Sequence, residues 1–518
     1  MQSKLNILEF ILPFIYFFVF VAIVFKVNFF NSAVLSRQSS AILYTIKVLA
    51  GIVFYLAYTY YYNYYTTSDA YKYFQDSTIL FNSLKENPLH YIQMLTGINS
   101  SDSELVKYYE EMNYWFTGIE NNIFNDNRTV IRFNAFVYLF SSGNFYVHIL
   151  FICFLSFSGL VALLKAFVMM VPNRRNEFIV AVFLIPSVLF WTSGVLKEGL
   201  LVFGLGFFVY SFTRILFDYG KKWMNYLGII LFAFAILMSK AYILFVLIPG
   251  IFTLFFLRFV PLDSYRGKKQ AYVILGTLVL LVTIGAAIIS KNETINPLSI
   301  IAKKQSDFIN LANGGTYFKI NNAKCDTIFL KYGDEKQIIN TGNSKAYKLK
   351  SNTEYYTWYK GRIIDTITIT ANDTLTCKML AQFNQTVSKI EIHKLQPTLL
   401  SFLKNTPQAI FNGLFRPTFA DEDKTFMKLC AIENYFLLFT IFLSIIFFKK
   451  PKNGEWSFII LCISFTLLLA VLIGFTTPVL GALVRYKVPL LPFIFGCFFI
   501  LINPRVTKPL GWIGKLLY

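Results

Sequence analysis

Long runs of apolar residues, separated by short polar connections, occupy most of this chain. Many of the runs reach the roughly 18 residues that identify a membrane-spanning helix. The pattern predicts eleven spans, near residues 6–26, 42–62, 146–166, 178–193, 199–215, 225–239, 242–258, 271–289, 430–448, 457–475 and 486–503. The expected fold class is therefore an all-α polytopic membrane protein.

Two longer polar segments interrupt the apolar runs. Residues 63–145 contain "STILFNSLKENPLHYIQML", whose apolar positions recur at helical spacing, and this favours amphipathic helices lying along the membrane surface. Residues 290–429 contain "YKLKSNTEYYTWYKGRIIDTITITANDTLTCKML", which is rich in Thr, Tyr and Ile with turn signals and predicts a small β-rich domain. The chain thus divides into an N-terminal membrane region (1–289, including the loop 63–145), an extracytoplasmic segment (290–429) and a C-terminal membrane region (430–518).

Composition and charge agree with a membrane protein. The chain is 56% hydrophobic and 18% aromatic, and its formal net charge is +20. The basic residues lie mostly in every second short connection, beginning with Lys26, Arg37 and Lys47, so the positive-inside rule explains them better than a nucleic-acid partner does. We expect a multi-pass protein of the bacterial cytoplasmic membrane, in contact with membrane lipids, with its N-terminus and both large loops outside and its C-terminus inside.

Cysteine and tyrosine positions add two further expectations. Four cysteines lie in or beside apolar runs and are expected to be small core residues: Cys153, Cys430, Cys462 and Cys497. Cys325 and Cys377 share the second polar segment and could pair in an oxidising compartment, although spacing alone does not test the geometry. The tyrosine-rich run "YLAYTYYYNYYTT" (55–67) fits an interfacial aromatic belt, with sugar stacking as the alternative.

Several charged residues break the positive-inside pattern. The short connections expected to face outward contain "WTSGVLKEG", "LMSKAY" and "TTPVLGALVRYKVPLLP", which place five charged residues at one membrane face: Lys197, Glu198, Lys240, Arg485 and Lys487. Asp69 follows the second span and Arg416 precedes the ninth, at the same level. Any one of them could pair locally or snorkel to lipid phosphate. Together they predict a polar functional site, because ionisable residues at membrane depth are costly.

This combination of charges suits one kind of chemistry. Several cations near the headgroup level would hold a phosphate or pyrophosphate, and a nearby carboxylate would deprotonate an acceptor hydroxyl. Such a site predicts sugar transfer from a polyprenyl-phosphate lipid donor to a glycan, lipid or protein acceptor. The sequence has no P-loop, no G-x-G-x-x-G motif and no G-x-S-x-G nucleophile elbow.

Three of these stretches resemble the GT-C superfamily of integral-membrane glycosyltransferases, in the branch related to protein mannosyltransferases and bacterial polyprenyl-phosphate-sugar transferases. They are "SDAYKYF" in the first outer loop, "PSVLFWTSGVLKEG" and "RYKVPLLP". The resemblance implies that Asp69 is the catalytic base, with Tyr73 and Asp76 on the same helix as further site candidates. It also implies that Lys197 and Arg485 bind donor phosphate, and the charges at the same membrane face add Lys240, Arg416 and Lys487 as candidates for that role. Glu198 would bind a divalent metal or orient Lys197; the cofactor itself stays unassigned, with Mg²⁺ or Mn²⁺ as the candidate.

Two alternatives are left open by the residues. The stretch "LFRPTF" is similar to sequences of oligosaccharide repeat-unit polymerases and O-antigen ligases, in which outer-face arginines hold a lipid pyrophosphate without metal. In that case Arg416 and Arg485 would be central and Asp69 less so. The third possibility is a transporter or a non-catalytic membrane scaffold, although the unusual charges gather at one face rather than near the midplane.

Overall fold

The computed structural model describes most of the chain. The described residues are 8–32, 34–61, 68–115, 126–217, 220, 222–257, 275–276, 278–279, 281–282, 285, 296–320, 327–331, 338–340, 346–349, 353–359, 362–369, 374–383, 385–386, 388–421, 424–452 and 454–507. Between residues 315 and 383, and at residues 8–10, the description covers the backbone alone.

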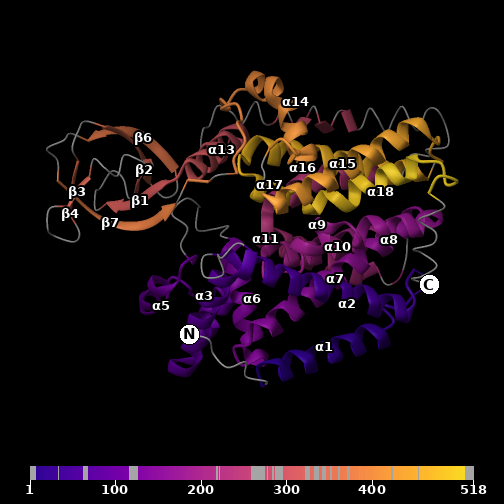
Figure 1. The fold of residues 1–518 in the computed structure, drawn as a ribbon, viewed down its shortest axis with the longest axis horizontal. Coiled ribbons are helices and arrows are strands. Elements are labelled where there is room, and N and C mark those ends of the chain that lie inside the picture. The colour runs from indigo at the N-terminus through magenta and orange to yellow at the C-terminus, as the bar shows by residue number, and fades with distance from the viewer. Residues whose placement is uncertain are drawn as a thin grey trace.

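Apolar helices make up the body of the molecule (Figure 1). In the described part of the chain, seven helical segments are long and apolar enough to cross a membrane: Arg37–Tyr60, Phe145–Met170, Lys197–Leu216, Lys222–Phe255, Thr425–Ile446, Glu455–Thr476 and Leu480–Leu501. They correspond to α2 (Arg37–Leu56) with its short π-helical extension, α7 (Phe145–Met170), α10 (Lys197–Leu216), α11 (Lys222–Leu257), α15 (Thr425–Ile446), α16 (Glu455–Thr476), and α17 (Leu480–Tyr486) with α18 (Leu491–Leu501). The protein is therefore a multi-pass membrane protein.

The remaining predicted spans do not each correspond to one long helix. The first becomes α1 (Leu8–Lys26), whose apolar part is shorter than the seven. The fourth becomes two short helices, α8 (Arg175–Phe183) and α9 (Pro186–Trp191), separated at a proline. The predicted spans 225–239 and 242–258 are the two halves of α11, and most of the predicted span 271–289 lies outside the described residues. The number of eleven spans stays a prediction.

Helix α11 is interrupted at Lys240, where the backbone leaves the helical region with φ −155° and ψ 90°. In the first half, Gly228 lies against Ser211 and Ile236 lies against Gly204, so this half runs antiparallel to α10. The second half packs against α16. Lys240 consequently lies at the end of the bundle where α10 begins.

The described residues of the first polar segment form four α-helices: α3 (Asp69–Glu86), α4 (Pro88–Thr96), α5 (Val106–Glu111) and α6 (Asp126–Ser141). Local signals set their ends. The Ser68 hydroxyl accepts a hydrogen bond from the Tyr71 amide and caps α3, and α4 ends at Gly97 in the left-handed conformation, with φ 83°. We call this side of the bundle the Asp69 end. The opposite side, where α7 finishes and α8 begins, is the Arg174 end.

A seven-stranded sheet lies within the segment for which the sequence predicts a β-rich domain. Its strands are β1 (Gly315–Ile320), β2 (Thr327–Lys331), β3 (Ile338–Asn340), β4 (Ala346–Leu349), β5 (Thr353–Tyr359), β6 (Arg362–Ile369) and β7 (Thr374–Phe383). The strand order is β3-β4-β7-β1-β2-β5-β6, and neighbouring strands are antiparallel.

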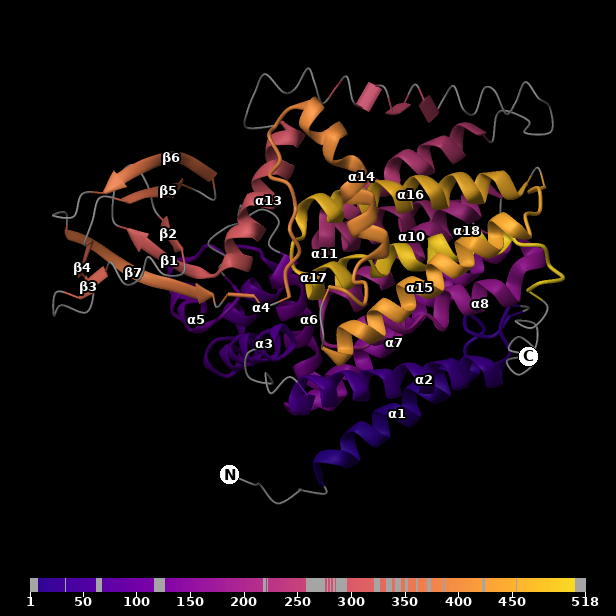
Figure 2. The ribbon, with the colours of Figure 1, turned by 45° about the horizontal axis from the view of Figure 1, so that its top comes forward.

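Two helices connect this sheet to the bundle, α13 (Pro297–Asn313) and α14 (Leu399–Phe415), and both pack against α16 (Figure 2). The chain entering the sheet meets the chain leaving it, because the Thr386 amide donates to the Ala312 carbonyl at 2.9 Å. The Cys325 partner of the proposed disulfide lies outside the described residues, so this pairing is not tested.

The loop pattern predicts the wrong position for one lysine of the bundle core. Lys47 is expected with the basic residues of a connecting loop, but it lies inside α2 and its exposed fraction is 0%. The positive-inside rule counts basic residues near span ends, and it does not resolve how deep in a helix each one lies. The four cysteines of the apolar runs are buried and free, as predicted.

Candidate functional site

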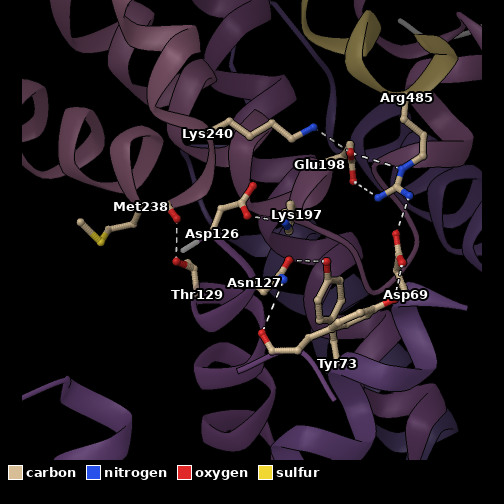
Figure 3. A network of polar contacts seen from close by, with 11 residues as sticks. Asp69, Tyr73, Asp126, Asn127, Thr129, Lys197, Glu198, Met238, Lys240 and Arg485 are labelled. Carbon is tan, nitrogen blue, oxygen red and sulfur yellow. Dashed lines mark hydrogen bonds and ion pairs between the residues drawn. The ribbon is translucent and has the colours of Figure 1, made fainter. Parts of the chain in front are cut away.

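Charged side chains from five helices meet at the Asp69 end of the bundle (Figure 3). Asp69 is the first residue of α3, Asp126 is the first residue of α6, and Lys197 and Glu198 begin α10. The remaining two are Lys240, at the interruption of α11, and Arg485, near the end of α17. We call these six residues the Asp69 cluster. Each stands at a helix end or a helix break, where the polar loops and the apolar bundle meet.

The cluster is organised around Arg485, which two carboxylates share. Its Nη1 contacts Asp69 Oδ2 at 2.8 Å, and its Nε and Nη2 lie 3.5 Å from the two Glu198 oxygens. Lys240 Nζ donates to Glu198 Oε1 at 3.0 Å from the other side. The chain of contacts therefore alternates in charge: carboxylate, guanidinium, carboxylate, ammonium.

Exposure falls from the outer to the inner residues of this chain of contacts. The Asp69 side chain is 39% exposed, Arg485 is 16% exposed, and Glu198 and Lys240 are enclosed at 1% and 4%. A ligand approaching from solvent or from the headgroup region would meet Asp69 and Arg485 first. Glu198 lies behind them and holds the guanidinium in place, and Lys240 in turn holds Glu198.

A fourth ion pair joins the cluster through Lys197, whose Nζ lies 2.5 Å from Asp126 Oδ1. Both side chains are partly exposed. Asp126 is a participant that the sequence interpretation does not select, because it is one of many acids in residues 63–145. The only signal available was its place at the start of an amphipathic helix, where an acid is favoured by the helix dipole in any case.

Aromatic rings line the cations. Lys240 Nζ lies 4.0 Å from the centre of the Tyr486 ring, and the Arg485 guanidinium lies 5.6 Å from the Trp191 ring. Lys197 Nζ lies 5.8 Å from the Tyr73 ring. Such cation–π contacts favour the charged form in a partly desolvated site. They also give the cluster flat apolar surfaces next to its charges.

Hydrogen bonds of Tyr73, Tyr114 and Asp76 order the residues around Asp69. Tyr114 donates its hydroxyl to Asp69 Oδ1 at 3.1 Å, and the Tyr73 hydroxyl donates to Asn127 Oδ1 at 2.8 Å. Asp76 is fully buried and accepts hydrogen bonds from the backbone amides of Asn113 and Tyr114, both at 2.7 Å. Asp76 therefore acts on the cluster through the segment that carries Tyr114, without reaching the charges itself.

The surroundings of Asp69 keep it ionised. Burial acts to raise its pKa, but the charge and hydrogen bond of Arg485, with further contributions from Lys197 and Tyr114, hold the pKa below its usual range. Burial and the neighbouring Asp69 charge raise the pKa of the Tyr114 hydroxyl, so that it stays a donor. The Asp69 carboxylate is a poor base while it is paired with Arg485, and it becomes a stronger base when Arg485 binds another anion.

Two predicted phosphate-binding residues belong to a different set of contacts. Lys487 is fully buried, and its Nζ donates to the Asn434 side chain and, at 3.2 Å, to the Arg416 carbonyl. The Arg416 guanidinium contacts Asp421 at 3.3 Å. These interactions anchor the chain after α14 to α15 and α17. The structure thus brings Asp69, Lys197, Glu198, Lys240 and Arg485 together and does not add Arg416 or Lys487 to them.

The donor atoms of the cluster do not fit a divalent metal. Both Glu198 oxygens face cations of the protein, Lys240 and Arg485. Within the described residues, no group of three or more His, Cys, Asp or Glu side chains is arranged to hold a metal ion. Mg²⁺ and Mn²⁺ favour several oxygen ligands, and a site already occupied by two protein cations repels them. We derive no step through a metal.

Comparison with family models, curated proteins and solved structures gives no match to this chain. Functional inference therefore depends on the cluster itself and on the physical chemistry of its residues.

Proposed function

We propose that this protein is an integral-membrane glycosyltransferase that moves a sugar from a polyprenyl-phosphate donor to an acceptor hydroxyl on the extracytoplasmic side of the membrane. The observation that carries the proposal is the Asp69–Arg485 pair. It joins a partly exposed carboxylate to a guanidinium at the mouth of an apolar helix bundle, with Lys197 beside it. A lipid phosphate needs cations at the membrane surface, and sugar transfer to a hydroxyl needs a base next to them.

The geometry supports a defined sequence of contacts. The donor phosphate would bind Arg485 and Lys197, the two partly exposed cations of the cluster. Phosphate oxygens would then compete with Asp69 for the guanidinium. Because Glu198, itself held by Lys240, contacts Arg485 from behind, the guanidinium can turn from Asp69 to the phosphate while keeping its buried contact. Donor binding would in this way release the carboxylate that the reaction needs.

In the transfer step, the acceptor oxygen attacks the anomeric carbon of the donor sugar as the bond from that carbon to the phosphate oxygen breaks. Asp69 takes the proton from the acceptor hydroxyl. The electron pair of the broken bond stays on the polyprenyl phosphate, whose added charge Arg485 and Lys197 stabilise. Every atom of the donor is thereby accounted for in the glycoside and the lipid phosphate.

The alternative of a repeat-unit polymerase or ligase depends more strongly on Arg416. In the structure Arg416 contacts Asp421, and its carbonyl accepts from the buried Lys487. These contacts give no specific support for a pyrophosphate site there. The Asp69 cluster therefore favours the transferase.

The test combines a deletion strain with a single substitution. Mass spectrometry of surface glycans and lipid-linked intermediates should show the loss of one sugar in the deletion strain, restored by the wild-type gene. Asp69→Asn should fail to restore it and lower transfer by roughly 10²- to 10⁴-fold in the purified protein. Glu111→Gln, an exposed acid of the same polar segment, is the matched control and should restore it fully. Full transfer by Asp69→Asn would eliminate the proposed base, and unaltered glycans in the deletion strain would count against the whole proposal.

A further inference from the structure

Lys47 is a fully buried lysine in the middle of a spanning helix, and its partners are unusual. Its Nζ donates to the Thr192 hydroxyl at 2.6 Å and to the Ser193 hydroxyl at 3.3 Å. Within the part of the chain that the structure describes, it forms no ion pair with a carboxylate. A charged side chain at such depth is costly, and buried charges are normally paired. Packing therefore does not explain why this position is a lysine.

The two hydroxyls belong to the turn that leads into the Asp69 cluster. Residues 192–196 connect α9 to α10, and Lys197 and Glu198 follow directly. The Thr192 and Ser193 hydroxyls use their own protons to bond the Val188 and Leu189 carbonyls, both at 2.6 Å. The hydroxyl oxygens therefore accept from Lys47 through their lone pairs, and the ammonium joins the turn to α2.

The backbone hydrogen bonds of the turn are local, because the Thr192, Ser193 and Leu196 amides donate to carbonyls of residues 188–194. Leu196, the N-cap residue of α10, makes no capping side-chain hydrogen bond. Against α2 and α7 the turn packs closely: a Cβ at Gly51 would lie 3.1 Å from the Ser193 carbonyl oxygen, and the Cys153 thiol lies 3.6 Å from that oxygen. Lys47 consequently supplies a directional side-chain contact that ties the turn to α2.

We propose that Lys47 is a positioning residue for the Asp69 cluster. It fixes the depth and orientation of residues 192–196, so that Lys197 meets Asp126 and Glu198 meets Lys240 and Arg485. The inference rests on the proposed function for its effect on transfer, but its structural part can be tested independently. Lys47 touches none of the cluster charges itself and acts through the turn.

The decisive variant is Lys47→Met, which keeps the length of the side chain and removes the charge and the donors. A lysine that served only the fold would lower the thermal midpoint when lost. A positioning lysine should leave the midpoint unchanged or higher, since a buried charge is removed, while transfer falls roughly 10- to 100-fold through misplacement of the cluster. The double variant Thr192→Val with Ser193→Ala removes the other side of the same contact. Its loss should not add to that of Lys47→Met, because both changes break one interaction.

A cross-linking measurement separates this inference from the proposed activity. Lys197→Cys and Asp126→Cys place two thiols at a contact of the cluster, and their oxidation to a disulfide in membranes reports its geometry without any substrate. Introducing Lys47→Met should slow this cross-link several-fold. Thr213→Val, which removes a buried hydroxyl on α10 that bonds the Val209 carbonyl, is the control and should not slow it.

Each outcome decides one question. An unchanged cross-linking rate with Lys47→Met overturns the positioning role, whether or not the protein transfers sugar. A lowered thermal midpoint with an unchanged rate assigns Lys47 to stability alone and overturns it as well. A cross-link that Lys47→Met slows, together with no sugar transfer by the wild-type protein, would support the role of Lys47 while the proposed transferase fails.

Discussion

The two ends of the helix bundle each contain a charged network, and the two networks are built differently. At the Arg174 end, Arg174 is 2% exposed and contacts Glu177 Oε1 at 2.8 Å. Its other nitrogen donates to the carbonyls of Ile500 and Ile502 at 3.1 and 2.7 Å. Thr507 completes the set by donating to Glu177 at 3.0 Å. One cation and one carboxylate are thus closed off by backbone carbonyls and a hydroxyl.

At the Asp69 end, three cations and three carboxylates share their contacts, and exposure changes from one residue to the next. Arg485 divides its guanidinium between Asp69 and Glu198 instead of ending on fixed carbonyls. Such an arrangement can exchange one anion for another, whereas the Arg174 network cannot open without exposing a buried charge. The same residue types therefore stabilise the fold at one end and provide a replaceable contact at the other.

Among the variants that compare the two ends, Arg485→Met is expected to have the largest effect on transfer. It removes the cation that is proposed to hold the donor phosphate, so transfer should fall by roughly 10²- to 10³-fold. Lys240 still neutralises Glu198 in this variant, so the folded protein should persist. Transfer assays in nanodiscs, with circular dichroism as the folding check, measure both. Near-normal transfer would mean that Arg485 does not bind the donor.

Arg174→Met tests the opposite end and should affect stability instead. It leaves Glu177 buried without its cation, which costs about 3–5 kcal/mol. Thermal unfolding in detergent should show a clear fall in the midpoint, and the protein that stays folded should transfer sugar at the wild-type rate. If transfer per folded molecule fell as far as with Arg485→Met, the distinction between the two ends would be wrong.

A pH measurement sharpens the contrast at Asp69. Its pKa is held below the usual range, so the stabilisation from the Arg485 pair is present above about pH 4 and is lost as the pH falls through the lowered pKa. Carbodiimide labelling of Asp69, which requires the protonated carboxyl, should therefore have a lower pH midpoint in the wild-type protein than in Arg485→Met. Identical Asp69 midpoints in the two proteins would show that Arg485 does not hold the carboxylate.

The smallest effect is expected at an exposed pair. Lys107 and Glu86 lie 3.2 Å apart with both side chains about 60% exposed. Solvent screens such pairs, so Lys107→Met should leave both the thermal midpoint and transfer nearly unaltered. A larger loss of stability would indicate that proximity alone, rather than enclosure, sets the importance of ion pairs in this protein.

Part of this organisation can be predicted from the sequence. Lys197, Glu198, Lys240 and Arg485 stand out because charges are unexpected in short connections on that face. Asp69 stands out because it lies at the same level just after a span, and the structure brings these five together. Lys487 and Arg416 satisfy the same two criteria, yet Lys487 binds the Asn434 amide and the Arg416 carbonyl, and Arg416 binds Asp421. Charge and depth can be read from a sequence, but the direction of a side chain around its helix depends on packing against distant segments.

The depth of Lys47 and the order of the strands show the same limit. Lys47 is the eleventh residue of α2. The sequence pattern predicts a position near the end of the apolar run, because the helix boundary is uncertain by a few positions. In the sheet, β1 lies between β2 and β7, and β7 also pairs with β4. Alternation of apolar and polar residues predicts a strand and which of its side chains share a face. The pairing of strands that are far apart in the sequence depends on tertiary contacts.

The contact between Ala312 and Thr386 has a consequence for how this chain can be altered. Because the polypeptide leaves the helices and returns to them at neighbouring points, the whole sheet is an insertion with closely spaced ends. Lys389 strengthens this neck by donating to the Asn313 side chain at 3.0 Å. A gene in which residues 315–385 are replaced by a short flexible linker should still encode a complete helix bundle, since no spanning segment has to be rethreaded. The sheet is thus a part that can be exchanged or deleted in a single genetic step.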